Sequence, residues 1–164
     1  MEESKIIKLI TKEGKEIEIT KDAAVLSELL KKTINDFPDE EKFSINEIDE
    51  KTGEKIKEYL IHFNGNAPPE IEKPLKSNNM KNVTDEWSAN FMNRMSFDDI
   101  INLSVAANYM GINCLLDLCS AKIASSFKDK SEELIKKEFN IKQSLTEEEK
   151  NKIREENKWI EANI

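Results

Sequence analysis

The spacing of apolar and polar side chains predicts a small sheet at the start of the chain. Glutamate and isoleucine alternate over residues 16–19, which is the pattern of a half-buried strand. An apolar run at residues 6–10 precedes this strand across a turn, and residues 43–45 predict a short third strand. Because a two-stranded ribbon is only marginally stable by itself, we expect helices to cover its apolar face.

The same region carries two helical patterns. Leucines recur at helical spacing within residues 21–37, so we expect one helix there, which ends before Pro38. A second helix is predicted where apolar side chains follow the i, i+3, i+4, i+7 rule, at Ile56, Tyr59, Leu60 and Phe63.

The next two regions differ sharply in composition. Residues 64–86 contain Pro68, Pro69, Pro74 and several asparagines, which predict a mobile and functionally quiet linker. Residues 87–162 predict helices, with Gly111 as a break between two of them. Capping signals for these helices lie at Ser96 with Asp99, at Ser131, and at Thr146 with Glu149. An apolar stripe after the break comprises Ile112, Leu115, Leu116, Cys119, Ile123 and Phe127.

The last predicted helix carries few apolar side chains. They are essentially Ile153, Trp159, Ile160 and Ala162, and nearly every other side chain is charged or an amide. A lone helix of this length is marginal in water. It is therefore either a frayed, solvated terminus or a helix that orders on a partner with Trp159 as its anchor.

Charge and cysteine usage restrict the class of protein. Asp plus Glu number 33 against 25 Lys plus Arg, giving a net charge of −8, which argues against nucleic acid and anionic membranes as partners. The acidic N-terminus has no apolar signal core and no apolar run could span a membrane, so we expect a cytoplasmic and nuclear protein. Cys114 and Cys119 point to different faces of one predicted helix, so no intrachain disulfide is expected.

The residues form no catalytic or metal-binding constellation. The single histidine, His62, has no partner that would orient it as a general base. A zinc site needs three or four ligands at known spacings, which two cysteines do not supply. The four glycines are isolated, so no phosphate-binding loop is predicted. We therefore expect a binding module without enzyme activity, metal or cofactor.

The C-terminal half carries a series of motifs in order. They are Trp87 with Phe91, Ala106–Met110 with Ile112, Leu115–Asp117, Phe139–Ile141, Thr146–Glu149, and Arg154 with Glu156, Asn157 and Trp159. Together they resemble the S-phase kinase-associated protein one family, the adaptor subunits of SCF (cullin–F-box) ubiquitin ligases. The resemblance is strong over residues 87–160 and weaker but colinear over residues 5–63.

This resemblance implies a fold and a role. The fold is α+β, a BTB/POZ domain in which helices cover a small sheet of about three strands, extended by two C-terminal helices. Residues 1–63 and 87–130 would form the domain, 64–86 a flexible loop, and 131–164 the F-box-binding helices. The role is a non-catalytic adaptor that brings F-box proteins and a cullin together, so that proximity assists ubiquitin transfer. A homodimer of the free chain is also implied.

The family's binding residues carry over by position. The cullin face would contain Ile101, Ser104, Asn108 and Tyr109; family members usually have a bulky apolar residue where this chain has Ser104, so apolar contact is lost there. The F-box face would contain Leu116, Phe139, Asn140, Ile141, Ile153, Asn157 and Trp159.

Two alternatives stay open at this point. An elongin-C-like adaptor shares the BTB core but stops before the last two helices, which the motifs after residue 131 argue against. A self-associating BTB scaffold without a ligase role would use the apolar C-terminal surface for a homodimer instead.

Overall fold

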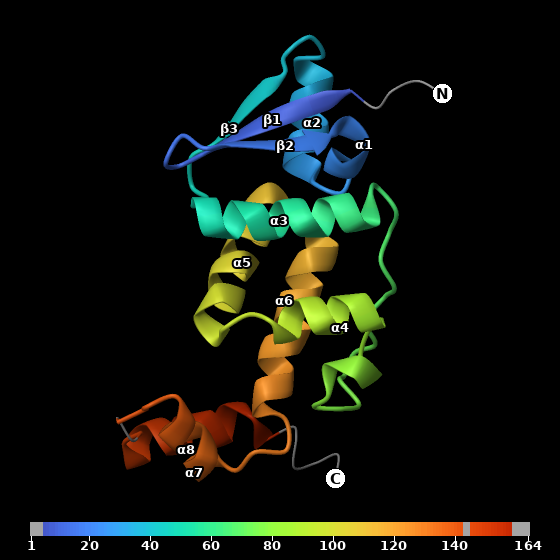
Figure 1. Ribbon diagram of the computed structural model, residues 1–164. Helices are drawn as coiled ribbons and strands as arrows, with labels where there is room; N and C mark the ends of the chain where they lie inside the picture. The colour runs from blue at the N-terminus through green and yellow to red at the C-terminus, as the bar shows by residue number, and fades with distance from the viewer. Residues whose placement is uncertain (1–4, 143–144, 159–164) are drawn as a thin grey trace. The chain divides into compact units, whose positions relative to one another are not determined.

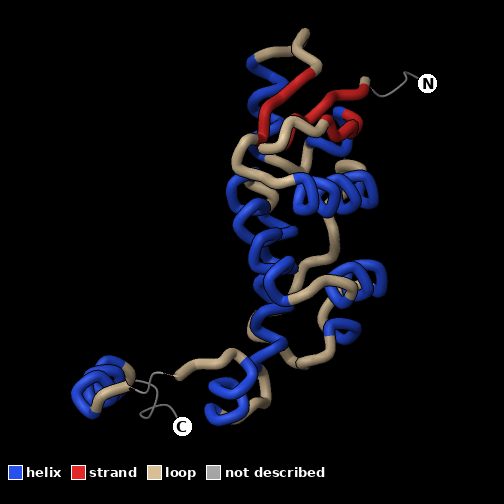
Figure 2. The backbone as a smooth tube through the Cα atoms, turned by 60° about the vertical axis from the view of Figure 1, so that its left-hand side comes forward, coloured by secondary structure: helices blue, strands red, loops and turns tan. Residues whose placement is uncertain are grey.

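The computed structural model describes residues 5–142 and 145–158, which fall into two compact units (Figure 1). Unit 1 comprises residues 1–128 and unit 2 comprises residues 129–164. The strands gather at one end of unit 1, and helices make up the rest of it (Figure 2). The predicted α+β class is confirmed, and the sheet has the three strands that the pattern of apolar residues indicated.

The sheet has the strand order β2-β1-β3. Strand β1 (Ile6–Thr11) is antiparallel to β2 (Glu16–Thr20) and parallel to β3 (Lys42–Ile45). Every second side chain of the strands is buried, as the alternation predicted. The sheet therefore presents one apolar face to the helices.

The single helix predicted over residues 21–37 was wrong. The structure contains α1 (Lys21–Ala24) and α2 (Glu28–Asp36), with Ser27 between them. Ser27 is fully buried, and its hydroxyl accepts a hydrogen bond from the backbone N–H of Leu30 at 3.2 Å. A buried serine in this position starts a new helix, because its side chain caps an N-terminus.

Helix α3 (Glu50–Phe63) connects the sheet to the other helices of unit 1. Asp49 caps its first turn by accepting from the Thr52 N–H at 2.9 Å. The helix packs on β2 on one side and on α5 on the other (Figure 1). Its apolar positions at 56, 59 and 60 are buried, as their spacing predicted.

The remaining α-helices of unit 1 are α4 (Glu86–Asn93), α5 (Phe97–Met110) and α6 (Asn113–Phe127). Gly111 has a φ of 63° and ends α5, which confirms the predicted break. Helix α6 packs against α5, and the thiols of Cys114 and Cys119 in α6 are free.

The segment that joins α3 to α4 packs more closely than its composition suggested. It contains a short 3₁₀ helix, η1 (Met80–Asn82), in which Met80 is buried. Ile71, Leu75 and Val83 pack against the core of unit 1, and Lys73 pairs with Asp117 of α6 at 2.9 Å. The sequence did not predict this packing, whereas the mobility of the segment stays a prediction.

Unit 2 contains α7 (Glu132–Glu138) and α8 (Glu147–Glu156). Ser131 caps α7 and Thr146 forms a capping box with Glu149 at the start of α8, as predicted. None of the described residues of unit 2 is buried. Within this described part, the helix starts follow local capping signals and no side chain is buried in a core.

Candidate protein-binding faces

Helix α5 is anchored firmly enough to display side chains at fixed positions. Ser96 and Asp99 form a reciprocal capping box at its N-terminus. The Lys51 ammonium, and after it the Ser96 hydroxyl, lower the pKa of the Asp99 carboxyl. The inner face of the helix is buried through Ile100, Leu103, Ala106, Ala107 and Met110.

The outer face of α5 exposes an apolar stripe. Ile101, Val105 and Tyr109 are 38, 65 and 42 % exposed and lie four residues apart, so they line one side of the helix. Asn108 is exposed and Ser104 is half-buried on the same side. The structure thus brings together the four residues predicted for cullin binding and adds Val105, which its spacing from Ile101 and Tyr109 could have indicated.

Ser104 interrupts this stripe with a polar side chain. Its hydroxyl donates to the backbone carbonyl of Ile101 in the preceding turn at 2.7 Å. The hydroxyl is therefore satisfied within its own helix. Ser104 offers less apolar surface than a bulky residue would, whereas Val105 beside it is 65 % exposed.

Unit 2 exposes a second group of apolar side chains. Leu134, Ile141, Leu145 and Ile153 are between 45 % (Ile153) and 55 % (Leu134) exposed. Leu134 and Leu145 were not among the predicted binding residues. Leu145 precedes the Thr146 cap, where an apolar residue usually packs on the fourth helical position, but that position is Lys150. Leu145 therefore lacks its usual apolar neighbour in the first turn of α8, which the sequence alone could have shown.

The other residues predicted for F-box binding differ in burial and lie in both units. Asn140 follows α7 with a φ of 51°, which asparagine tolerates well, and Phe139 beside it is half-buried. The side-chain amide of Asn157 donates to the Ile153 carbonyl at 2.7 Å and closes α8. Leu116 lies in α6 and packs against the core of unit 1. Trp159 lies outside the described residues.

Aromatic side chains pack α3 against α4 within unit 1. The His62 ring stacks on Trp87 with centroids 3.7 Å apart and planes 2° apart, and Trp87 stacks on Phe91 at 5.0 Å. Arg94 lies over the Phe91 ring and pairs with Glu58 at 2.6 Å. His62 thus has a structural contact that accounts for its position.

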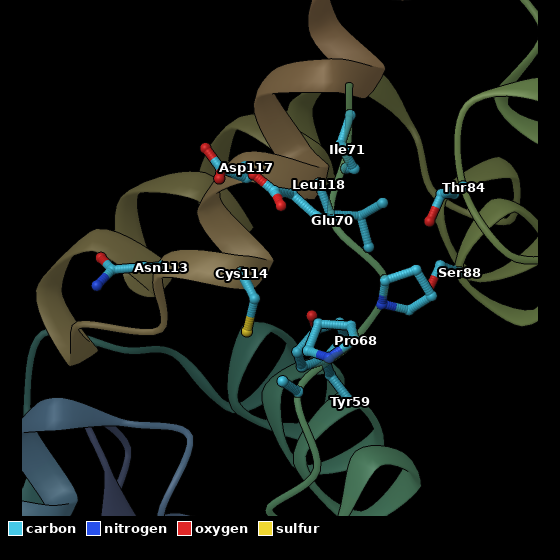
Figure 3. A pocket seen from close by; sticks show the side chains of 12 residues that line it. Tyr59, Pro68, Glu70, Ile71, Thr84, Ser88, Asn113, Cys114, Asp117 and Leu118 are labelled. Carbon is cyan, nitrogen blue, oxygen red and sulfur yellow. The ribbon is translucent and has the colours of Figure 1, made fainter. Parts of the chain in front are cut away.

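A pocket of about 220 Å³ lies between α3, α4, α6 and the segment from Pro68 to Ile71 (Figure 3). Tyr59 and Cys114 line it, but no histidine does. Burial raises the pKa of the Tyr59 hydroxyl above its usual range, so it stays protonated. Asp117, on the rim, is paired with Lys73. The lining thus contains hydroxyl, thiol and carboxylate groups but no histidine.

The described residues offer little else in the way of chemistry. They contain no group of three or more His, Cys, Asp or Glu side chains placed to hold a metal ion. Burial raises the pKa of the Cys119 thiol to about 12, so it is not a thiolate at neutral pH. Within residues 5–142 and 145–158, no helix combines the length and the apolarity needed to cross a bilayer.

Comparison with known proteins identifies the relatives of the chain. A model of the Skp1 family tetramerisation domain matches residues 5–65, and one of the Skp1 family dimerisation domain matches residues 113–160. The S-phase kinase-associated protein 1 homolog of Tetrahymena thermophila is 38 % identical over 155 residues, 94 % of this chain and 93 % of that protein. The E3 ubiquitin ligase complex SCF subunit sconC of Arthroderma otae is 34 % identical over 156 residues, 94 % of each chain. The sconC protein of Emericella nidulans is also 34 % identical, over 96 % of this chain and 97 % of its own length.

These matches cover both the sheet-containing part of the chain and its C-terminal helices. They confirm the family resemblance that the motifs carried and the predicted BTB/POZ fold. The chain belongs to the Skp1 family.

Proposed function

We propose that this chain is an adaptor subunit of an SCF ubiquitin ligase, which joins a cullin to F-box proteins. The observation that carries the proposal is the similarity to SCF subunits over 94 % of the chain, including the region of α7 and α8. An elongin-C-like adaptor would lack those two helices. The comparisons give no support to a scaffold outside ubiquitin ligases.

The exposed stripe of α5 is the proposed cullin face. Tyr109 combines a rigid apolar body with a polar tip, which suits an interface anchor. Ile101 and Val105 extend the apolar contact along the helix, and Asn108 adds hydrogen-bonding groups. Because the inner side of α5 is buried in unit 1, these side chains need little ordering when a partner docks.

Unit 2 is the proposed F-box face. Its helices expose leucine and isoleucine side chains that no core covers, so a partner that buries them gains apolar contact. The same side chains could be covered by a second copy of the chain, which we propose as a homodimer of the free adaptor. F-box protein and homodimer would then compete for one surface.

The adaptor itself carries out no chemistry in this proposal. It raises the local concentration of a substrate that is bound to the F-box protein near the ubiquitin-carrying enzyme on the cullin. We place this activity in the cytoplasm and the nucleus.

Two substitutions on α5 test the proposal. Asn108→Lys with Tyr109→Lys adds two positive charges to the face and removes its anchor, so we expect loss of cullin binding with unchanged F-box binding. Asn35→Lys with Asn90→Lys is the matched control, because both are exposed helical asparagines away from the stripe. Binding of a cullin N-terminal fragment and of an F-box protein would be measured by titration calorimetry.

The outcomes separate clearly. Loss of cullin binding only in the α5 variant supports the proposal. Cullin binding at full strength in that variant contradicts the assigned face, and failure of the unmodified chain to bind any cullin contradicts the adaptor role.

A further inference from the structure

The C-terminal end of α5 is held by residues from a distant part of the chain. The last carbonyl groups of a helix have no partner within it. Here the Met110 carbonyl accepts a hydrogen bond from the Ser27 hydroxyl at 2.6 Å, and the Gly111 carbonyl accepts one from the Glu28 N–H at 3.3 Å. The corner between α5 and α6 is thereby tied to the first residues of α2.

The Ser27 hydroxyl connects two helix ends at once. It accepts from the Leu30 N–H at 3.2 Å, which caps α2, while it donates to Met110 at the end of α5. Ser27 is fully buried, so water cannot replace either bond. Replacing it by alanine would leave the Met110 carbonyl unpaired in the interior.

Glu28 makes a further contact with the same corner. Its carboxylate accepts from the side-chain amide of Asn113 at 3.1 Å, at the first residue of α6. A Cβ on Gly111 would lie only 3.0 Å from the Glu28 Cβ, so the two backbones approach closely. Both the left-handed φ of Gly111 and this close approach favour glycine at the corner.

We infer that Ser27 and Glu28 are positioning residues for the cullin face of α5. Asn108 and Tyr109 lie in the last turn of α5, directly before the two tethered carbonyls. Neither Ser27 nor Glu28 belongs to the exposed stripe, so both act through the geometry of the helix end. Holding an anchor in its bound position before the partner arrives raises affinity, because less freedom is lost on binding. This inference rests on the proposed function.

The test compares two capping variants of the full chain. Ser27→Ala removes the cap of α2 together with the bond to Met110. Asp85→Ala is the control, because Asp85 caps α4 in the same way, accepting from the Ser88 N–H at 3.0 Å, but makes no bond to the corner. We expect Ser27→Ala to weaken cullin binding about tenfold, as for a lost buried hydrogen bond, while Asp85→Ala changes it less than about twofold.

Two further readouts distinguish positioning from general destabilisation. Amide hydrogen exchange at Gly111 and Ile112 should speed up in Ser27→Ala and not in Asp85→Ala, even where both lower the Tm. F-box binding should stay unchanged in both variants. Equal loss of cullin affinity in the two variants, or no loss in Ser27→Ala, would overturn the inference.

If the Ser27→Ala variant fails to fold, Glu28 provides a second test, because its side chain is exposed. Glu28→Ala removes the contact with Asn113 and should weaken cullin binding, whereas Glu28→Gln keeps an acceptor oxygen there and should restore it. Identical cullin affinity in both Glu28 variants and the unmodified chain would overturn the part assigned to Glu28. If the unmodified chain binds no cullin, the proposed function fails; if it does and the Ser27 and Glu28 variants match it, only the positioning role fails.

Discussion

Helices α6 and α8 are stabilised by different interactions, although the pattern of side chains predicted a helix in both places. Helix α6 has no side-chain cap at Ile112, yet it buries Leu115, Leu118 and Cys119 in unit 1. Helix α8 begins with a complete capping box at Thr146 and Glu149, yet none of its residues is buried. A cap decides where a helix starts, whereas packing supplies most of its stability.

The same contrast separates the two units. Unit 1 has a continuous core from the sheet to α6, and within its described residues no buried side-chain polar atom lacks a hydrogen-bond partner. The described residues of unit 2 expose leucines and isoleucines, and their ion pairs lie at the surface, where such pairs contribute little to stability. Substitutions in unit 1 should therefore affect folding first, and substitutions in unit 2 should affect binding first.

The largest effect is expected in the aromatic core of unit 1. Phe91 is 1 % exposed and stacks on Trp87, so Phe91→Ala should lower the free energy of unfolding by about 3–5 kcal/mol through the cavity it leaves. Its counterpart in unit 2, Ile153→Ala, should change that free energy by less than about 0.5 kcal/mol. Urea denaturation followed by circular dichroism measures both. Similar losses would remove the distinction between the units.

A substitution of Trp159 tests whether unit 2 binds the F-box protein. Trp159→Ala should weaken F-box binding by about 2 kcal/mol or more, as expected for a central aromatic anchor. The melting temperature should stay nearly unchanged, because this prediction assigns the side chain to the interface. Calorimetric titration with an F-box protein and a thermal melt decide whether Trp159 is an interface anchor or a core residue. A lower Tm with unchanged affinity would place Trp159 in a core.

The two capping boxes give a smaller and closely matched comparison. Ser96→Ala should lower the free energy of unfolding by about 1 kcal/mol, because α5 belongs to the cooperative core of unit 1. Thr146→Ala removes the equivalent bond from α8 and should leave global unfolding unchanged while weakening F-box binding. Both variants would be followed by denaturation and by binding. If Thr146→Ala destabilises the whole chain as much as Ser96→Ala, the two units unfold together.

The smallest expected effect concerns pH. The Glu16 carboxylate accepts hydrogen bonds from Lys42 at 2.5 Å and Lys8 at 2.9 Å, which lower its pKa to about 2. A carboxyl with a lowered folded pKa stabilises the protein above its unfolded pKa of about 4.3, and this stabilisation is lost as the pH falls towards 2.

The size of this effect is limited because Glu16 is exposed to solvent. Melting temperatures of the unmodified chain should fall slightly more than those of Glu16→Gln between about pH 5 and pH 3. Glu40→Gln, another exposed carboxyl of unit 1, serves as the control. Parallel pH profiles for the unmodified chain and Glu16→Gln would show that the lysine pairs contribute nothing to stability.

Features with local causes were predictable from the sequence. The strands followed the alternation of isoleucine with glutamate, and the helix starts at Ser96, Ser131 and Thr146 followed their capping residues. The end of α5 followed Gly111, whose left-handed conformation a helix end requires. In each case the deciding contacts lie within a few residues.

Features decided by distant contacts were missed. Ser27 divides the predicted helix through a local cap, but its hydroxyl also donates to Met110, 83 residues away, a contact that the sequence does not indicate. The burial of Met80 depends on helices that its own segment does not predict. Val105 could have been found, because it completes the four-residue spacing between Ile101 and Tyr109. The binding roles of these side chains stay predictions, because exposure alone identifies no partner.

The most direct test of the two-unit account is to separate the units. A chain that ends at Lys130 would be compared with the intact chain for binding to a cullin fragment and to an F-box protein, with circular dichroism to check folding. We predict that the shortened chain folds, keeps its cullin affinity and loses F-box binding. A folded, shortened chain that loses cullin binding, or that still binds the F-box protein fully, would contradict the assignment of one partner to each unit.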